Sequence, residues 1–247
     1  MKTITQRLFI AALFLLIAQA AFAQTADEII EKHLAAIGGR AALAKIKSRV
    51  MMGTITASSP VGDVTGSVEI YNQAPNKART LIKIDLSAVG AGQMVQDQRF
   101  DGNVGFVMDT LQGNRDITGN QLDNMKNTIF PSALLNYKEV GSIELRGKEK
   151  VGDREAYLLV GTPKTGSVVR LYLDAESYLP IKSVVKVNLP QIGADVEQTT
   201  EMLDYRDVDG VKVPFQIRGT SDIQTYTINV TKVEHNTDLE QAIFSKP

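Results

Sequence analysis

The spacing of apolar residues changes along this chain, and each change indicates a different kind of secondary structure. After Thr25 the apolar positions repeat every three to four residues, which is the spacing of an amphipathic helix. Glu28 stands three residues after Thr25, so the two residues form a capping box at the start of that helix. Gly38 and Gly39 supply the left-handed backbone that ends a helix. We therefore predict a helix between Thr25 and Gly38, followed by a shorter helical stretch over residues 40–46.

From Lys47 the apolar positions alternate, which is typical of antiparallel strands with one buried face and one face in water. Turn residues separate the alternating runs, and Asp101-Gly102 is a strong signal for a hairpin. The predicted strands cover residues 64–71, 79–86, 98–109, 143–148, 156–161, 168–174, 181–189, 196–208, 211–219 and 224–233.

Helical spacing returns once, in the middle of the chain. Thr118 and Gln121 form a second capping box, Pro131 ends the helix, and residues 132–137 are predicted to form another short helical turn. The apolar positions at helical spacing are Leu122, Met125 and Ile129. The pattern as a whole predicts a mainly β (α+β) fold. One large antiparallel sheet, interrupted once by helices, forms a single domain over residues 24–247.

The first 23 residues have the composition of a signal peptide. Lys2 and Arg7 precede an apolar run, and Ala21-Phe22-Ala23 offers the small residues of a cleavage site. The run is short for a membrane span and no charged stop follows it, although a retained anchor is the alternative. We expect cleavage after Ala23 and export of a soluble protein. Without cysteine, the chain has no disulfide and no lipid-modified N-terminal cysteine.

Composition and motifs argue against several classes of function. The 27 basic and 28 acidic residues are mixed along the chain, so nucleic acid is not an expected partner. Neither a G-x-S-x-G motif nor a cysteine is present to supply a nucleophile, and the two histidines lack the spacing of a zinc site. The glycines of residues 89–93 lack the third glycine and the following helix of a phosphate loop. We predict no enzymatic activity, no catalytic residue, no metal and no cofactor.

The segment DYRDVDGVKVPFQIRG, residues 204–219, concentrates aspartates around a glycine. An EF-hand loop with Gly210 at its sixth position would need ligands at Tyr205 and Gln216, and neither fits. We interpret Asp209-Gly210 as a hairpin turn. Pro214 lacks a ladder donor, so its strand is expected near an edge or a bulge. Four alternating residues are predicted to point into the core: Val211, Val213, Phe215 and Ile217.

His33 lies on the apolar stripe of the first helix, four residues after Ile29. A histidine in that position is typical of a packed or half-exposed imidazole rather than a ligand. We therefore predict a structural role for His33.

A wide sheet with one apolar face and few helices has either a filled core or a lined cavity, and alternation alone does not distinguish them. An open cavity would favour acyl chains, because each buried methylene contributes about 0.8 kcal/mol. Seven residues on the more apolar face of their strands are predicted to share one interior and to bind lipid there: Val68, Ile70, Ile82, Ile84, Phe106, Leu158 and Leu171.

Three stretches of the sequence, TADEIIEKHLAAIGGRAALAKIKS, EIYNQAPNKAR and YRDVDGVKVPFQI, together resemble exported bacterial proteins of the LolA/LolB-like outer-membrane lipoprotein-sorting superfamily. DGNVGF, LNYKEV and the closing IFSKP extend the similarity over most of residues 24–247. The resemblance implies an unclosed antiparallel half-barrel wrapped around helices. It also implies a periplasmic location and an apolar cavity for lipid or lipoprotein acyl chains.

Two functions are consistent with these observations. The first is a non-enzymatic, monomeric carrier or chaperone that shields acyl chains of lipids or lipoproteins from water. The second is a sensor or assembly module of the same fold, which acts through a membrane-bound or outer-membrane partner. A hydrolase is disfavoured because the nucleophile and histidine chemistry are missing.

Overall fold

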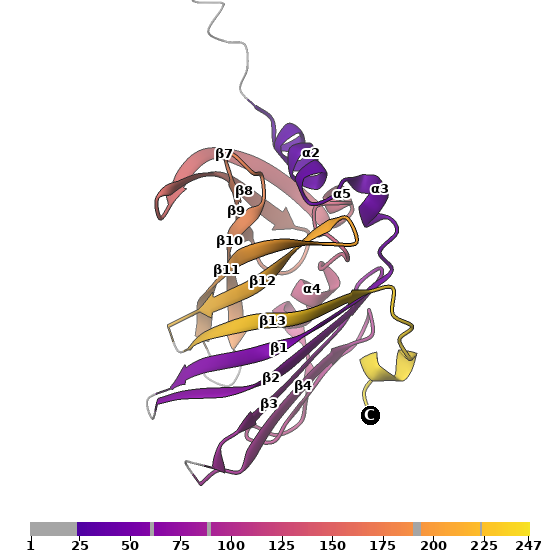
Figure 1. Ribbon diagram of the computed structural model, residues 1–247, viewed down its shortest axis with the longest axis vertical. Coiled ribbons are helices and arrows are strands. Elements are labelled where there is room, and N and C mark those ends of the chain that lie inside the picture. The colour runs from indigo at the N-terminus through magenta and orange to yellow at the C-terminus, as the bar shows by residue number, and fades with distance from the viewer. Residues whose placement is uncertain (1–23, 60–61, 88–89, 190–193, 223) are drawn as a thin grey trace, which may run out of the picture.

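The computed structural model describes residues 24–59, 62–87, 90–189, 194–222 and 224–247 (Figure 1). The predicted signal peptide, residues 1–23, lies outside the described residues.

The described strands form one 13-stranded antiparallel sheet with the order β6-β5-β4-β3-β2-β1-β13-β12-β11-β10-β9-β8-β7. Its strands are β1 Ser48–Ser59, β2 Gly62–Gln73, β3 Lys77–Asp85, β4 Gln93–Phe100, β5 Gly105–Asp109, β6 Arg115–Ile117, β7 Gly141–Val151, β8 Arg154–Pro163, β9 Val169–Asp174, β10 Pro180–Leu189, β11 Ala194–Val208, β12 Val211–Thr220 and β13 Thr225–His235. The sequence therefore located most strands correctly within a few residues.

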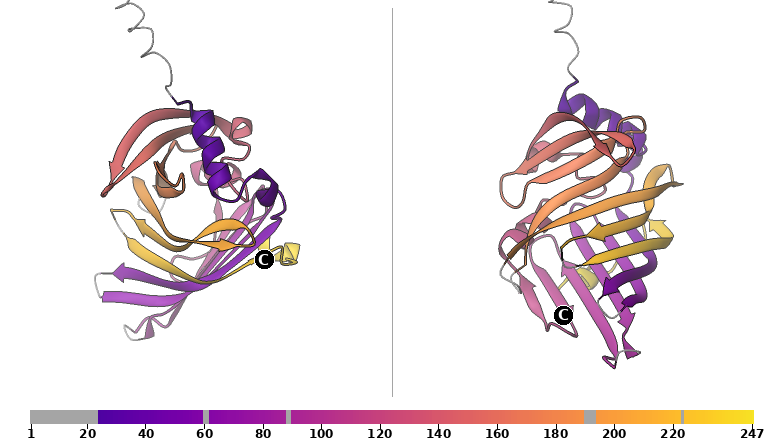
Figure 2. Two further views of the ribbon diagram at one scale, coloured as in Figure 1. Left: turned by 45° about the horizontal axis from the view of Figure 1, so that its top comes forward. Right: turned by 90° about the vertical axis from the view of Figure 1, so that its left-hand side faces the viewer.

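The order of the strands shows two meanders joined side by side. Strands β1 to β6 each pair with the next strand in sequence, as do β7 to β13, and the two meanders meet where β1 pairs with β13. The edge strands β6 and β7 do not pair with each other in the described part of the chain, so the sheet stays open. Figure 2 shows the sheet bent into an open arc. The predicted unclosed half-barrel is confirmed.

The α-helices are short and lie toward the inside of the arc, whereas the C-terminal 3-10 helix packs on the outer face. They are α2 Ala26–Ala36, α3 Arg40–Leu43, α4 Gly119–Lys126 and α5 Tyr137–Val140, with a 3-10 helix at Gln241–Phe244. Helices α2, α3 and α5 gather at the end of the sheet where β7 lies (Figure 1). The segment that carries α4 and α5 connects the two edge strands of the sheet.

The first predicted capping box is confirmed and the second is wrong. The Thr25 hydroxyl accepts a hydrogen bond from the Glu28 amide at 3.2 Å, and the Glu28 carboxylate accepts one from the Thr25 amide at 3.1 Å. Thr118 makes no such bond before α4. That helix also ends earlier than predicted. Asn127 directly follows the last residue of α4, and its side-chain amide donates to the Thr165 carbonyl at 2.6 Å.

The main core lies on the inner face of the sheet, where side chains of α2 contact it. Ile29, Ile30 and Leu34 are almost fully buried there, together with inward residues of β1, β2, β8, β12 and β13. A 3% exposed His33 belongs to the same helix face. Smaller clusters cover the outer face, including one between β1 and the C-terminal 3-10 helix that buries Phe244. The inner face is therefore the side on which a ligand site can form.

The hairpin between β11 and β12 confirms the predicted turn. Asp209 and Gly210 have φ values of 52° and 78°, and the Gly210 amide donates to the Asp207 carboxylate at 3.0 Å. β12 pairs with β13 only from Gln216 onward, so Pro214 lies along a locally free edge, as predicted. The four β12 residues that we expected in the core, Val211, Val213, Phe215 and Ile217, belong to it or pack against it.

The end of α2 closes onto the free stretch of β12. The Lys212 amide donates to the Ile37 carbonyl at 3.0 Å. A Cβ at position 38 would lie 2.4 Å from the Gly210 carbonyl oxygen, so only glycine allows this approach. This contact fixes α2 at one end of the sheet.

None of the described helices is both long and apolar enough to cross a membrane. Within the same residues, no group of three or more histidine and carboxylate side chains is placed to bind a metal ion.

Candidate ligand cavity

A cavity of about 490 Å³ lies between the inner face of β7–β11 and the segment that carries α4 and α5. Its volume falls in the range of roughly 300–1,000 Å³ that is typical of small-molecule sites. The apolar side chains in its wall include Leu134, Val140, Ile143, Leu159, Pro163, Val169, Leu171, Val185, Val187 and Met202. Val169 is 37% exposed and Thr128 is exposed, so this end of the cavity is open.

The alternation of the strands explains why the wall is apolar and why space remains in it. Ile143 of β7 pairs with Gly161 of β8, which in turn pairs with Val169 of β9. Gly161 contributes no side chain between these two apolar neighbours. A Cβ built there would make only ordinary contacts, at 3.7 Å from the Val169 carbonyl oxygen and 3.9 Å from Ile143 Cγ1. The missing side chain therefore leaves room inside the cavity.

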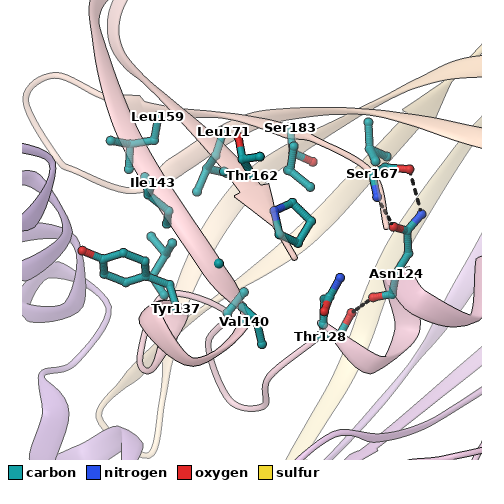
Figure 3. Close-up of a pocket in the computed structure, with 18 of the residues that line it drawn as sticks. Asn124, Thr128, Tyr137, Val140, Ile143, Leu159, Thr162, Ser167, Leu171 and Ser183 are labelled. Atoms are coloured by element: carbon teal, nitrogen blue, oxygen red, sulfur yellow. Dashed lines mark hydrogen bonds between the residues drawn. The ribbon is translucent and has the colours of Figure 1, made fainter. Parts of the chain in front are cut away.

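Amide and hydroxyl side chains fix the polar end of the cavity. Figure 3 shows Asn124, Thr128 and Ser167 together at one end, away from Tyr137, Ile143 and Leu159. The Asn124 side chain accepts from the Ser167 amide at 2.7 Å and donates to the Ser167 hydroxyl at 3.1 Å. These bonds hold α4 against the loop between β8 and β9, so α4 covers the cavity from one side.

Titratable groups are scarce in the wall. None of the lining residues is a lysine, arginine, aspartate or glutamate, and the two titratable groups are His33 and Tyr137. The Tyr137 hydroxyl donates to the Asp27 carboxylate, and burial together with that bond raises the pKa of Tyr137. The arrangement can enclose an apolar chain, but it presents no group of the described residues as a charged nucleophile or a carboxylate pair.

His33 is packed, as predicted, but it also contributes to the cavity wall, which sequence reasoning missed. Its Nδ1 lies 3.0 Å from the carbonyl oxygen of Tyr178. Burial lowers the pKa of His33, and the bond to Tyr178 only partly opposes this effect. The imidazole is therefore neutral near pH 7.

Five of the seven residues predicted to bind lipid lie on the inner face. Leu171 lines the cavity. Val68 and Ile84 are 2% and 4% exposed within the core, and Ile70 and Ile82 pack against it. The core around β2 and β3 is thus filled, and the cavity described above lies in the other meander. The sequence left open whether the interior is a cavity or a filled core, and the structure has a filled core in one meander and a cavity in the other.

The placement of the other two residues was wrong. Leu158 packs on the outer face with Tyr172 and Ile181, whereas its neighbour Leu159 points inward. Residues 157–160 are all apolar, so their periodicity does not identify the buried face. Phe106 pairs with Arg99, and the Lys246 ammonium lies 4.6 Å from its ring centroid.

The C-terminal segment explains why an apolar residue such as Phe106 lies on the outer face of β5. Lys246 and the buried Phe244 bring this segment against the outer face of β1–β5, where it covers apolar side chains that would otherwise meet water. The inward residue of β5 is Val107, which is 1% exposed. Apolar residues therefore occur on both faces of this sheet, so an apolar side chain in a strand does not by itself identify the inner face.

Sequence reasoning also missed most of the cavity wall. Ile143 and Val169 were placed on strands, but their pairing across Gly161 was not visible in the sequence. The available signal was Gly161 itself, which ends a run of five consecutive apolar residues, 156–160.

Comparison with solved structures supports the fold described above. No protein-family model matches this sequence, and no curated protein matches it. A LolA superfamily protein from Nitrosomonas europaea superposes with a TM-score of 0.56 at 16% identity, covering 91% of this chain and 99% of that one. A DUF1329 family protein from Desulfovibrio piger gives a TM-score of 0.56 at 14% identity, with 89% and 96% covered. A proposed outer membrane lipoprotein-sorting protein domain from Vibrio parahaemolyticus gives 0.53 at 14% identity, with 88% and 94% covered. The chain therefore has the LolA-like fold.

Proposed function

We propose that this protein is an exported, periplasmic carrier that binds an acyl chain of a lipid or lipoprotein in the cavity under α4 and α5, without catalysing a reaction. The observation that carries the proposal is the apolar wall of the roughly 490 Å³ cavity, which is open at Val169. The likeness in fold to a LolA superfamily protein and to a proposed lipoprotein-sorting domain is consistent with it. Fold alone does not establish a function.

The chemistry of the wall favours a chain rather than a polar metabolite. Leu159, Leu171 and Val185 offer no hydrogen bonds, so a polar ligand would lose its hydration without compensation. An acyl chain gains about 0.8 kcal/mol for each methylene removed from water. The amides and hydroxyls near the open end leave the polar part of such a ligand close to solvent (Figure 3).

Two neighbouring valines provide a sharp test. Val169 lines the cavity and is 37% exposed, whereas Val168 is 49% exposed and is not among the lining residues. We expect Val169→Glu to lower the affinity for a fluorescent fatty acid about tenfold or more, since it places a carboxylate where the chain lies. Val168→Glu should bind like the wild type. Both variants should unfold cooperatively, because neither site is fully buried.

Organic extraction of the purified protein, followed by mass spectrometry, measures the native ligand directly. Co-purified lipid that is lost in Val169→Glu and retained in Val168→Glu would support the carrier. Absence of lipid, together with no binding of the fatty acid by the wild type, would contradict it. That result would favour the sensor or assembly module acting through a membrane-bound partner.

A further inference from the structure

A row of three polar side chains crosses the inner face of the sheet where the two meanders meet (Figure 1). Arg49 of β1 pairs with His235 of β13 on one side and with Asn72 of β2 on the other. Met51 and Ile70, two residues away along their strands, lie in the inner core or pack against it, so the alternation of the strands places the three polar side chains on the same face. Cross-strand partners have Cβ atoms about 4.5–5.5 Å apart, so these polar groups are neighbours.

His235 holds the Arg49 side chain in place. The His235 side chain is 1% exposed, and its Nδ1 lies 3.2 Å from the Asp209 carboxylate. An ionised carboxylate only accepts hydrogen bonds, so Nδ1 carries the proton, and Nε2 accepts from Arg49 Nε at 2.9 Å. The guanidinium also lies over the Phe130 ring, with 5.3 Å between Arg49 Cζ and the ring centroid. These two contacts orient the guanidinium group.

The far end of the guanidinium has no partner from the protein. Arg49 is half-buried, and neither of its Nη groups donates to any residue that the structure describes. Burial lowers the pKa of Arg49 to about 10, and no carboxylate opposes this effect. Neither Nη atom is fully enclosed, so a solute can reach them. The side chain of Asn72 is also half-buried and makes no hydrogen bond within the described ranges of the chain.

The unused donors fit an oxyanion. Because His235 occupies Nε, the guanidinium presents its two Nη groups, which can donate parallel hydrogen bonds to two oxygens of one phosphate or carboxylate group. The carboxamide of Asn72 can donate one more hydrogen bond. A half-buried positive charge without a counter-charge is unfavourable, and an anion supplies what the protein lacks. A neutral ligand would leave the charge of Arg49 uncompensated.

We propose that Arg49 and Asn72 bind an oxyanion, a phosphate or carboxylate group, at the junction of β1, β2 and β13. The group is either a free anion or the head of a lipid. This site is separate from the cavity. Thr128 and Ser132 line the cavity, whereas Phe130 between them is not a lining residue and contacts Arg49. The inference therefore does not depend on the proposed function.

An NMR titration of the wild type tests the site directly. The chain has only two histidines, so the ring resonances of His33 and His235 can be assigned. Inorganic phosphate is added at about pH 7.5, where both imidazoles are neutral because their pKa values are lowered, and sodium chloride keeps the ionic strength constant. We expect a saturable shift of His235, whose Nε2 accepts from Arg49, and no shift of His33. Chloride alone should shift neither histidine.

Arg49→Met and Arg146→Met form a matched pair for calorimetric titration with phosphate. Arg49→Met keeps an unbranched side chain but removes the charge, so we expect at least about a tenfold loss of affinity. Arg146 is 61% exposed and already pairs with Glu144 at 2.7 Å, so Arg146→Met should bind phosphate like the wild type. Asn72→Ala leaves Arg49 intact and should weaken binding about three- to tenfold. This variant also keeps the test valid if Arg49→Met does not fold.

Two further ligands identify the source of the anion. Acetate presents a free carboxylate, and dihexanoyl phosphatidic acid presents a phosphate on a lipid. Tighter binding of this lipid than of inorganic phosphate, lost in Arg49→Met, would assign the site to a lipid headgroup. Equal affinity for the two would assign it to a free anion.

Two results would contradict the site. One is a shift of His235 that does not saturate with phosphate. The other is phosphate binding in Arg49→Met or Asn72→Ala that equals binding in the wild type. Neither result would affect the carrier, because binding of a fatty acid is measured in the cavity and with other variants.

Discussion

Asp97 on the outer face of β4 shows how a single buried charge stabilises this fold. Its carboxylate accepts from Arg79 at 2.8 and 2.7 Å and from Arg99 at 3.1 and 2.8 Å. Burial alone would raise the pKa of Asp97, but the two guanidinium groups hold it below its usual value. Arg99 also donates to the Ser245 carbonyl at 3.2 Å, so the cluster ties the C-terminal segment to the sheet.

We expect Asp97→Asn to destabilise the protein by about 3–5 kcal/mol, because two largely buried arginines would lose their shared counter-charge. Asp116 provides the control. It is paired with Lys246 at 2.7 Å, but both side chains are 56% exposed, so Asp116→Asn should change stability by less than about 1 kcal/mol. Denaturant titration of both variants measures the difference. Equal losses of stability in the two variants would mean that the buried Asp97 cluster contributes no more than an exposed ion pair.

At the scale of the element, β8 combines two kinds of position that look alike in the sequence. Tyr157 and Leu159 point into the core, while Leu158 packs on the opposite face. Gly161 then leaves a gap in the inner row of side chains, next to Ile143. The apolar run makes β8 a strand buried on both faces, and the glycine turns part of its inner face into a cavity wall.

Filling that gap should separate binding from stability. Gly161→Val places its side chain in the cavity with no backbone clash, since the nearest atoms to a Cβ lie at 3.7 and 3.9 Å. We expect stability to stay within about 1 kcal/mol of the wild type, or to rise, because glycine is unfavourable in a strand. Binding of a fluorescent fatty acid should fall at least about tenfold, because the added side chain occupies the space for the chain.

Gly219→Val is the matched control, since it also replaces a strand glycine. A Cβ there would lie 2.2 Å from the ring of Tyr226, so this variant should lose stability. Residue 219 does not line the cavity, and the fraction that remains folded should bind normally. Similar behaviour of the two variants in melting and in binding would contradict the assignment of Gly161 to the ligand site.

At the scale of the whole molecule, stability should fall in two separate ranges of pH. Both histidines have a lowered pKa: burial is the cause for His33, and burial together with the nearby Arg49 is the cause for His235. Below about pH 6.5 the histidines of the unfolded chain are protonated more readily than those of the folded chain. The free energy of unfolding therefore decreases as the pH falls below this value. Asp97 has a lowered pKa as well, so its contribution is lost only below about 3.8.

Melting temperatures between about pH 7.5 and about pH 5 test the first of these ranges. The wild type should melt at progressively lower temperature, and the double variant His33→Phe, His235→Phe should show a flatter profile. A profile that is equally steep without the histidines would assign the effect to other groups.

The sequence predicted much of the local structure, apart from the cap and the end of α4, but it did not predict the site. Alternation of apolar residues and the turn at Asp209-Gly210 depend on contacts between neighbours in the chain, and these were predicted correctly. The wall of the cavity depends on which strands lie side by side, and on α4 being held by Ser167. Leu158 and Phe106 were misplaced because a second apolar layer, on the outer face, has the same local pattern as the interior.

The junction of β1 and β13 also determines when this sheet can be completed. Arg49 pairs with His235, so the first and last strands meet across 186 residues of chain. Contacts between residues so far apart form slowly, because a long loop must close before they stabilise anything. During synthesis the first meander can assemble early, yet the open side of β1 must wait for a strand that emerges last. Until then β1 presents unpaired amides and carbonyls, and such strand edges are where chains associate wrongly. Shortening the chain by its last strand would therefore leave two incomplete sheets rather than one slightly smaller one.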